Sequence, residues 1–336
     1  MGLKLSILAL CVVVGILHEN WKDRKRLSNL SLYSLIIGLS IVFTFREFMF
    51  DNPGTDYEEY KHWFEIMNIS RIKNQGFNNI GYNILICLIK FLGIDVYGFL
   101  FIIGMIINTS IFSFIKSHST SFSLSVALYI CLIYGSSFNI MRQWVAVAIF
   151  AYSIKYLMKK KYLPYLFCIA TASTFHLSAI PLAVVPLFFG KKRNYNREIL
   201  VIVIVSIIIT MKPDIVNGII FSNRIGIFNK YAIYFDRETG YSNYVYPTML
   251  GLSCLLCYFF RSKLTGYSNM REILVLSVLA FAVSLVSMRS FIFARFLLYF
   301  LPMLLLCIPL VLKVFDGRDR ALARFVIFTL ALIVYM

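Results

Sequence analysis

Apolar runs of membrane-spanning length recur along the whole chain, and short polar segments separate them. A run of about 20 apolar residues is long enough to cross the hydrocarbon core of a bilayer as a helix. Helices are the expected form, because backbone polar groups in lipid need hydrogen-bond partners within their own segment. The pattern therefore predicts an all-α polytopic integral membrane protein with about 11–13 membrane segments. We expect one transmembrane domain over residues 1–336.

Two apolar stretches are too short to make full membrane crossings, and a full crossing at 80–93 would also disagree with the sides that the flanking charges indicate. The apolar run 80–93 is shorter than a full span, and residues 162–190 have to leave and re-enter the same side. Pro164, Pro181 and Pro186 favour broken helices in the second stretch, because proline removes a backbone donor. Short re-entrant helices of this kind are tolerated where they line a cavity. We therefore predict a cavity that opens on the outer side.

Composition and charge fix the orientation of this topology. The mean hydropathy of +0.77 and a hydrophobic content of 60% exclude an ordinary soluble domain. The net charge of +17 could indicate nucleic-acid binding, but most of the basic residues lie in short loops between apolar runs. That distribution is the positive-inside pattern, so we expect no nucleic-acid partner. The loops richest in Lys and Arg are 18–27, 155–161, 190–197, 261–271 and 313–324. With these in the cytoplasm, the outer loops are about 46–79 and 212–244.

Acidic residues gather in the first outer loop, where residues 46–65 hold six of the chain's 16 acids. Pro53-Gly54 predicts a turn, and Thr55 or Asp56 is a candidate N-cap for a helix over 56–67. Tyr57 and Tyr60 would share one face of that helix. Carboxylates that accept hydroxyl hydrogen bonds, together with rings that stack on sugar faces, are the groups of a saccharide site. A helix that simply lies on the membrane surface is the alternative.

Arginines inside apolar segments are a second candidate site. Arg142 opens an apolar helix and Arg295 lies within an apolar run, where a charge is costly and usually faces a cavity. A planar guanidinium matches phosphate oxygens, so both residues are candidates to bind a pyrophosphate. Snorkelling to the interface is the alternative for both, and Arg289 fits an interface anchor better.

His176 is an isolated imidazole at the expected turn of the 162–190 stretch. It could be a structural residue, a phosphate ligand or a group that exchanges a proton. The sequence has no metal-ligand spacing and no nucleotide-binding motif, so we predict neither a metal site nor a cofactor.

These features together resemble the EpsG/Wzy-type bacterial polysaccharide polymerases. The residues that carry the resemblance run in order along the chain: Arg46, Gly54, Thr55, Asp56, Tyr57, Tyr60, Arg142, Gln143, Phe175, His176, Arg295 and Tyr299. One departure is Asn79 before Gly81-Tyr82, where the family pattern leads us to expect an acid.

The resemblance implies a membrane glycosyltransferase of GT-C-like fold in the bacterial inner membrane, with its active site facing the periplasm. Its substrate would be an undecaprenyl-pyrophosphate-linked oligosaccharide, from which a growing glycan is moved onto a new lipid-linked repeat. The product would be O-antigen, capsule or exopolysaccharide, and the partners would be membrane lipids and a chain-length regulator protein. A transporter or flippase for lipid-linked saccharides and an O-antigen ligase are the alternatives.

The corresponding mechanism is metal-independent glycosyl transfer. We expect Arg142 and Arg295 to bind the donor pyrophosphate, with Arg46 as a third candidate. Asp56 is the first candidate for the base and His176 the second. The expected substrate-binding residues are Arg46, Gly54, Thr55, Tyr57, Tyr60, Gln143, Arg289 and Tyr299.

Overall fold

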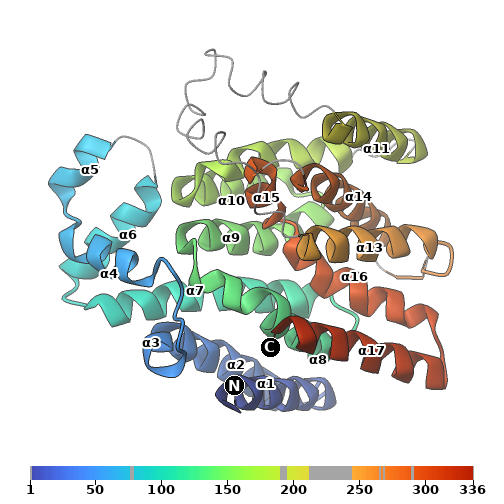
Figure 1. Cartoon of the computed structure of the whole chain (residues 1–336), viewed down its shortest axis with the longest axis horizontal. Helices are drawn as coiled ribbons and strands as arrows, with labels where there is room; N and C mark the ends of the chain where they lie inside the picture. Colours follow the sequence, from blue (N-terminus) through green and yellow to red (C-terminus); the bar gives the residue numbers. More distant parts are fainter. Residues whose placement is uncertain are drawn as a thin grey trace. The chain divides into compact units, whose positions relative to one another are not determined.

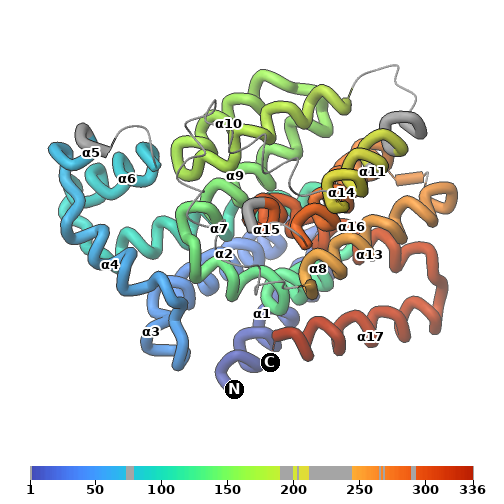
Figure 2. Tube along the Cα trace, turned by 45° about the horizontal axis from the view of Figure 1, so that its top comes forward, coloured from blue at the N-terminus to red at the C-terminus, as the bar shows by residue number. Residues whose placement is uncertain are grey.

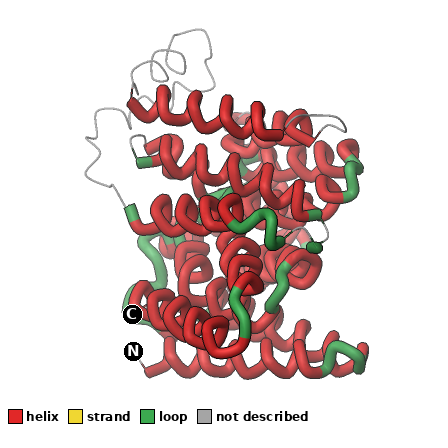
Figure 3. The backbone as a smooth tube through the Cα atoms, turned by 90° about the vertical axis from the view of Figure 1, so that its right-hand side faces the viewer, coloured by secondary structure: helices red, strands yellow, loops and turns green. Residues whose placement is uncertain are grey.

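A computed structural model gives the structure of the chain. It describes residues 2–75, 79–189, 195–211, 244–264, 266–267, 269–288 and 291–335. These residues form helices and connecting turns, and no strand occurs among them (Figure 3). The chain divides into two compact units, the first made of Met1–Leu187 with Gly317–Met336 and the second of Phe188–Asp316. The prediction of one transmembrane domain over the whole chain stays a prediction.

The first unit holds most of the helices. They are α1 (Gly2–Asn20), α2 (Lys25–Thr44), α3 (Arg46–Met49), α4 (Tyr57–Ile66), α5 (Ile69–Gln75), α6 (Ile80–Phe91), α7 (Val96–His118), α8 (Phe122–Leu128), α9 (Met141–Met158), α10 (Tyr162–Phe175) and α17 (Gly317–Tyr335). A π-helical turn (Tyr129–Ile133) and a 3₁₀ helix (Tyr134–Phe138) continue α8, and a longer 3₁₀ helix (Leu177–Phe189) follows α10.

Helix α9 lies in the middle of this unit. Figure 1 shows α10, α9, α7 and α2 as successive layers, and each packs against the next. Of the 18 residues of α9, 13 are buried, so this helix presents little surface to lipid. The small helices α3, α4, α5 and α6 group at one side of the layers (Figure 2). The start of α9 is therefore held by packing on both sides.

Both predicted short segments are short helices in the structure. Helix α6 covers 12 residues and α10 covers 14. After α10 the chain continues as the 3₁₀ helix that contains Pro181 and Pro186, so the predicted break within 162–190 is confirmed. How deep these segments lie in a bilayer stays a prediction.

The second unit contains α11 (Tyr195–Met211), α13 (Val245–Phe259), α14 (Met270–Ser287), α15 (Phe291–Leu297) and α16 (Leu304–Val311). Helix α14 packs against α11, α13 and α15, and α13 also packs against α16. Two buried thiols of this unit, Cys257 and Cys307, pack where α13 meets α16, and the Cys257 thiol contacts the Cys307 carbonyl oxygen at 3.6 Å.

Five helical segments among the described residues are long and apolar enough to cross a membrane. They are Gly2–Asn20, Lys25–Thr44, Val96–His118, Met270–Ser287 and Phe293–Val314. Shorter apolar helices, including α6, α10 and α13, accompany them. The chain is therefore an all-α polytopic membrane protein, as the hydrophobic pattern predicts.

Two buried hydrogen bonds join α7 to α2 and to the π-helical turn that follows α8. The Asn108 amide on α7 donates to Ser40 Oγ on α2 at 3.1 Å, and its oxygen accepts from the Tyr129 hydroxyl at 2.9 Å. All three residues are essentially inaccessible. Hydrogen bonds between polar groups buried in this way stabilise helix packing, because the Asn108 amide and the Tyr129 hydroxyl would otherwise lack these partners in an apolar surrounding.

We expect Asn108→Ala to lower the free energy of unfolding by about 1 kcal/mol, because it leaves two buried hydroxyls without this partner. Denaturation of the purified protein in mixed micelles measures the change. The control is Asn29→Ala, which removes only an exposed contact with Lys116. Equal stability of the two variants would contradict the structural role of the two buried hydrogen bonds.

Candidate functional site

The candidate site begins with the guanidinium of Arg46, which is fully buried. Its Nε donates to the Pro53 carbonyl oxygen at 2.8 Å, and its terminal nitrogens donate to the carbonyl oxygens of Phe43 and Phe138. The rings of Phe43, Tyr57 and Phe138 surround it, with the Tyr57 ring centroid 4.3 Å from the guanidinium carbon. Arg46 thus ties the end of α2 to the following loop and to the segment before α9.

Burial lowers the pKa of Arg46 to about 10, so the side chain stays charged at neutral pH. Three carbonyl oxygens and three rings compensate for the loss of hydration, as a buried charge requires. These contacts favour a structural role for Arg46. Its predicted role as a phosphate ligand stays untested.

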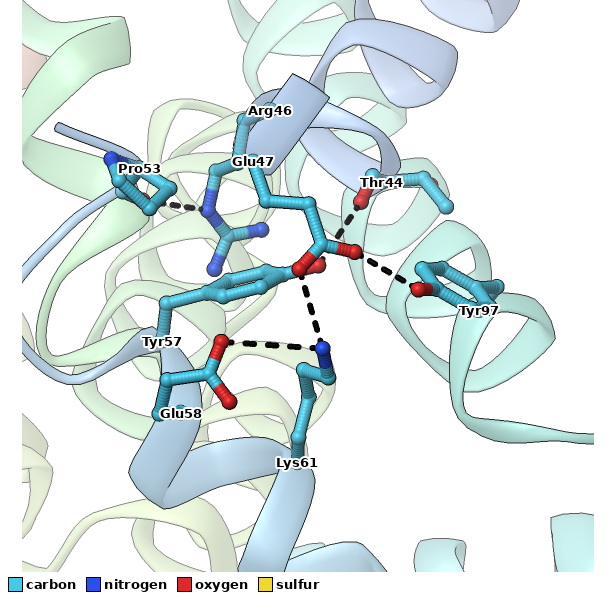
Figure 4. A network of polar contacts seen from close by, with 8 residues as sticks. All are labelled: Thr44, Arg46, Glu47, Pro53, Tyr57, Glu58, Lys61 and Tyr97. Atoms are coloured by element: carbon cyan, nitrogen blue, oxygen red, sulfur yellow. Dashed lines mark hydrogen bonds and ion pairs between the residues drawn. The ribbon is translucent and has the colours of Figure 1, made fainter. Parts of the chain in front are cut away.

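A second polar network fastens α4 beside Arg46 (Figure 4). The Glu47 carboxylate accepts from the Tyr97 hydroxyl at 2.7 Å and from Lys61 Nζ at 3.0 Å. Partial burial alone would raise the pKa of Glu47, but the hydrogen bonds from Tyr97 and Lys61 outweigh it and lower that pKa. Glu47 on α3 therefore remains ionised and links α4 to the start of α7.

Helix α4 shows the two faces that the sequence predicts. It begins after Asp56, and Tyr57 and Tyr60 are buried on one face. The acids Glu58, Glu59 and Glu65 are exposed and form its solvated face. The expected helix over 56–67 is confirmed within one residue at each end.

Gly54 lets the loop before α4 approach the segment before α9 closely. Its φ of +113° lies in a region that side chains rarely adopt. A Cβ at this position would lie 2.7 Å from Asn139 Oδ1 and 3.1 Å from the Phe138 carbonyl oxygen. The neighbouring Thr55 hydroxyl contacts the same Asn139 oxygen at 3.3 Å. A side chain at residue 54 would push these two segments apart.

The Asp56 carboxylate completes this contact. Its Oδ2 accepts a hydrogen bond from the backbone N–H of Ile140 at 3.1 Å, and its Oδ1 accepts from the Thr55 hydroxyl at 3.0 Å. Ile140 is the N-cap residue of α9 and has a φ of +43°, which is unfavourable for a β-branched residue. The carboxylate therefore lies at the start of the helix that carries Arg142.

Arg142 is half-buried in the first turn of α9. Its guanidinium carbon lies 5.7 Å from the centroid of the Tyr60 ring and 5.8 Å from that of the Tyr82 ring. With the Asn79 amide oriented to satisfy both of its ends, the amide oxygen accepts from Arg142 at 3.1 Å and the amide nitrogen donates to the Phe175 carbonyl oxygen at 2.8 Å. Asn79 thus bridges α9 and the end of α10.

His176 is the next residue after Phe175, whose carbonyl oxygen contacts Asn79, and it caps the C-terminal end of α10. Its Nδ1 contacts the Ser178 hydroxyl, which orients the ring. The first turn of α6 packs closely here, because a Cβ on Gly81 would lie 2.1 Å from the Thr174 hydroxyl. Asp56 thus contacts the residue two before Arg142, and Asn79 joins Arg142 to the carbonyl of the residue before His176.

The remaining predicted residues have different surroundings. Gln143 is buried in the first turn of α9. Arg295 on α15 and the buried Tyr299 belong to the second unit. Arg289 lies outside the described residues, as does almost all of the second outer loop. Their roles in substrate binding stay predictions.

Sequence reasoning assigned no role to three residues that shape this site. Asn79 and Ile140 both have positive φ and precede α6 and α9, and Tyr82 provides a ring beside Arg142. Asn79 carries a signal, since asparagine is enriched among residues with positive φ. No local pattern identifies Ile140, because its partner Asp56 lies 84 residues away in the sequence.

The EpsG family model matches residues 7–336, nearly the whole chain. The chain belongs to the EpsG family. This is a family of Wzy-type and exopolysaccharide polymerases, as the resemblance predicts. No curated protein and no solved structure matches this EpsG family protein significantly. The GT-C likeness therefore stays a prediction.

We expect Arg46→Ala to reduce the amount of folded protein in the membrane by about 10-fold or more, because loss of the buried charge leaves the carbonyl groups that it contacts unsatisfied. Quantitative immunoblotting of membranes and size-exclusion chromatography in detergent measure the effect. The matched control is Arg71→Ala, since Arg71 is an exposed arginine on α5. If Arg46→Ala accumulated normally and only lost activity, the structural role of Arg46 would be contradicted.

Proposed function

We propose that this chain polymerises polysaccharide by joining lipid-pyrophosphate-linked oligosaccharide repeats at the first-unit site around Arg142. Membership of the EpsG family supports a glycosyltransferase-like polymerase. The observation that carries the finer proposal is the place of Arg142. Its half-buried guanidinium lies at the N-terminal end of a buried helix, flanked by two tyrosine rings and the Asn79 amide.

The surroundings of Arg142 suit a pyrophosphate. A guanidinium offers a planar set of donors that matches phosphate oxygens. The partial positive charge at the N-terminus of α9 adds to this preference for an anion. Asn79 supports the guanidinium from one side, so little reorganisation is needed when charge develops on the leaving group.

The reaction breaks the bond between the anomeric carbon of the donor glycan and its pyrophosphate oxygen. The acceptor is a hydroxyl group of the terminal sugar on a second lipid-linked repeat, and its oxygen forms the new bond to the anomeric carbon. The acceptor proton passes to a base on the protein, and the polyprenyl pyrophosphate leaves. Arg142 stabilises the charge on that leaving group.

His176 is a candidate to take the acceptor proton, as is Asp56. An imidazole has an ordinary pKa near neutral pH, which suits proton transfer there. The contact with Ser178 fixes the ring, and the neighbouring Phe175 carbonyl is joined to Arg142 through Asn79.

The proposed polymerase would act at the outer face of the membrane on a lipid-linked substrate. The basic loops support an orientation with α4 outside, and hence a site on the outer face of a bacterial inner membrane. Undecaprenyl pyrophosphate is the lipid carrier expected there. Metal independence and a chain-length regulator as partner stay predictions, as does the part of Arg295 in donor binding.

We expect Arg142→Ala to lower polymer yield by about 100-fold or more while single-repeat lipid-linked glycan is retained, because charge stabilisation in the transition state is lost. Glycan profiling of a deletion strain that expresses each variant measures this. Arg142→Lys keeps the charge without the planar fork and should give an intermediate yield. The matched control is Arg71→Ala, which should polymerise normally.

Two outcomes would contradict the proposal. Normal polymer from Arg142→Ala, at normal protein level, would remove Arg142 from the active site. Loss of all attached glycan in the deletion strain, single repeats included, would indicate a flippase or a ligase instead.

A further inference from the structure

The carboxylate of Asp56 accepts hydrogen bonds from one backbone N–H group and one side-chain hydroxyl. One oxygen accepts the backbone N–H of Ile140 at 3.1 Å, and the other accepts the hydroxyl of the adjacent Thr55 at 3.0 Å. In the sequence analysis this residue is the first candidate for the catalytic base. The contacts point to a different task.

The backbone N–H of Ile140 needs a hydrogen-bond acceptor from outside α9. The first backbone donors of a helix have no acceptor within the helix, and a carboxylate near a helix N-terminus is favourable for the helix dipole. Ile140 also has a φ of +43°. A residue with a branched Cβ keeps such a conformation only when its surroundings hold it there. The hydrogen bond to Asp56 supplies that restraint.

Arg46 of α3 and two residues of the loop before α4 contact the three residues that precede α9. Arg46 donates to the Phe138 carbonyl oxygen, the Thr55 hydroxyl contacts Asn139, and Asp56 accepts from Ile140. The close approach at Gly54 keeps the two segments together. We call this set of contacts the loop clasp.

The loop clasp ends two residues before Arg142. Gln143 and Trp144 donate their backbone N–H groups to the Ile140 carbonyl oxygen at 2.9 and 3.1 Å. The conformation of Ile140 therefore sets the first turn of α9 and, with it, the place where the Arg142 guanidinium meets Tyr60 and Asn79.

We propose that Asp56 is a positioning residue, whose carboxylate fixes the first turn of α9 and thereby places Arg142, and that it does not take the acceptor proton. The proposal rests on the function proposed above for Arg142. It assigns the proton to another group, for which His176 is the candidate.

Three variants separate positioning from base catalysis. Asp56→Asn keeps an oxygen that can accept the Ile140 N–H but cannot act as a base. Asp56→Ala removes both capacities. The double variant D56A/I140G also lacks the carboxylate, but glycine adopts a positive φ without strain, so the first turn can form unaided. The matched control is Glu59→Gln, because Glu59 is an exposed acid of α4.

Polymer yield per amount of protein in the membrane is the readout, in a deletion strain that expresses each variant. We expect Asp56→Asn to stay within about 3-fold of wild type and Asp56→Ala to fall by about 10-fold or more. We expect D56A/I140G to recover at least about 3-fold over Asp56→Ala, because glycine relieves the backbone strain. Ile140→Gly alone and Glu59→Gln should polymerise like wild type.

A base at Asp56 requires the opposite result. Asp56→Asn and Asp56→Ala would then both fall by about 10²–10⁴-fold, and glycine at position 140 would rescue neither. Either finding, with wild-type protein levels, overturns the positioning role. Should Asp56→Asn fail to accumulate, the comparison of Asp56→Ala with D56A/I140G decides alone.

A different result is expected if the chain is not a polymerase at all. If the wild-type gene does not restore polymer to the deletion strain, the polymerase proposal fails before any Asp56 variant is compared. If wild type restores polymer and the glycine variant gives no rescue, only the positioning role fails.

Discussion

The buried guanidinium of Arg46 is the interaction on which the described site depends. A permanent charge without access to water has to be compensated by the protein, and here three backbone carbonyl oxygens and three aromatic rings do so. Those carbonyls come from the end of α2, from the loop before α4 and from the segment before α9. The carbonyl groups that compensate this one buried charge therefore bring together three segments of the chain.

The chemistry of the site follows from this arrangement. With the loop before α4 held in place, Asp56 reaches the N-cap residue of α9 and Tyr60 reaches the side chain of Arg142. Asn79 then joins Arg142 to the end of α10, next to His176. A guanidinium that is supported on several sides and only half-buried is suited to bind an anion that arrives from outside the protein. Membership of the EpsG family gives that anion its proposed identity as a lipid-linked pyrophosphate.

Much of the fold could be predicted from hydrophobic periodicity and prolines. The short α6, the break after α10 and the two-faced α4 all follow from local patterns. The site could be predicted only in part. Residue chemistry indicated a phosphate ligand at Arg46 and a base at Asp56, but each residue also makes a hydrogen bond with a backbone group far away in the sequence, at Phe138 and Ile140. Every residue except proline has a backbone N–H that could donate to Asp56. The identity of residue 140 as isoleucine therefore does not predict this hydrogen bond.

The most direct test of the account is reconstitution of the purified protein in liposomes with a polyprenyl-pyrophosphate-linked repeat unit. Free polyprenyl pyrophosphate and glycosidic bonds are then counted in the same reaction. We expect chains of increasing length and one polyprenyl pyrophosphate released for each new bond, with Arg142→Ala inactive. Movement of the repeat across the bilayer without bond formation, or chain growth without release of the lipid pyrophosphate, would contradict polymerisation at Arg142.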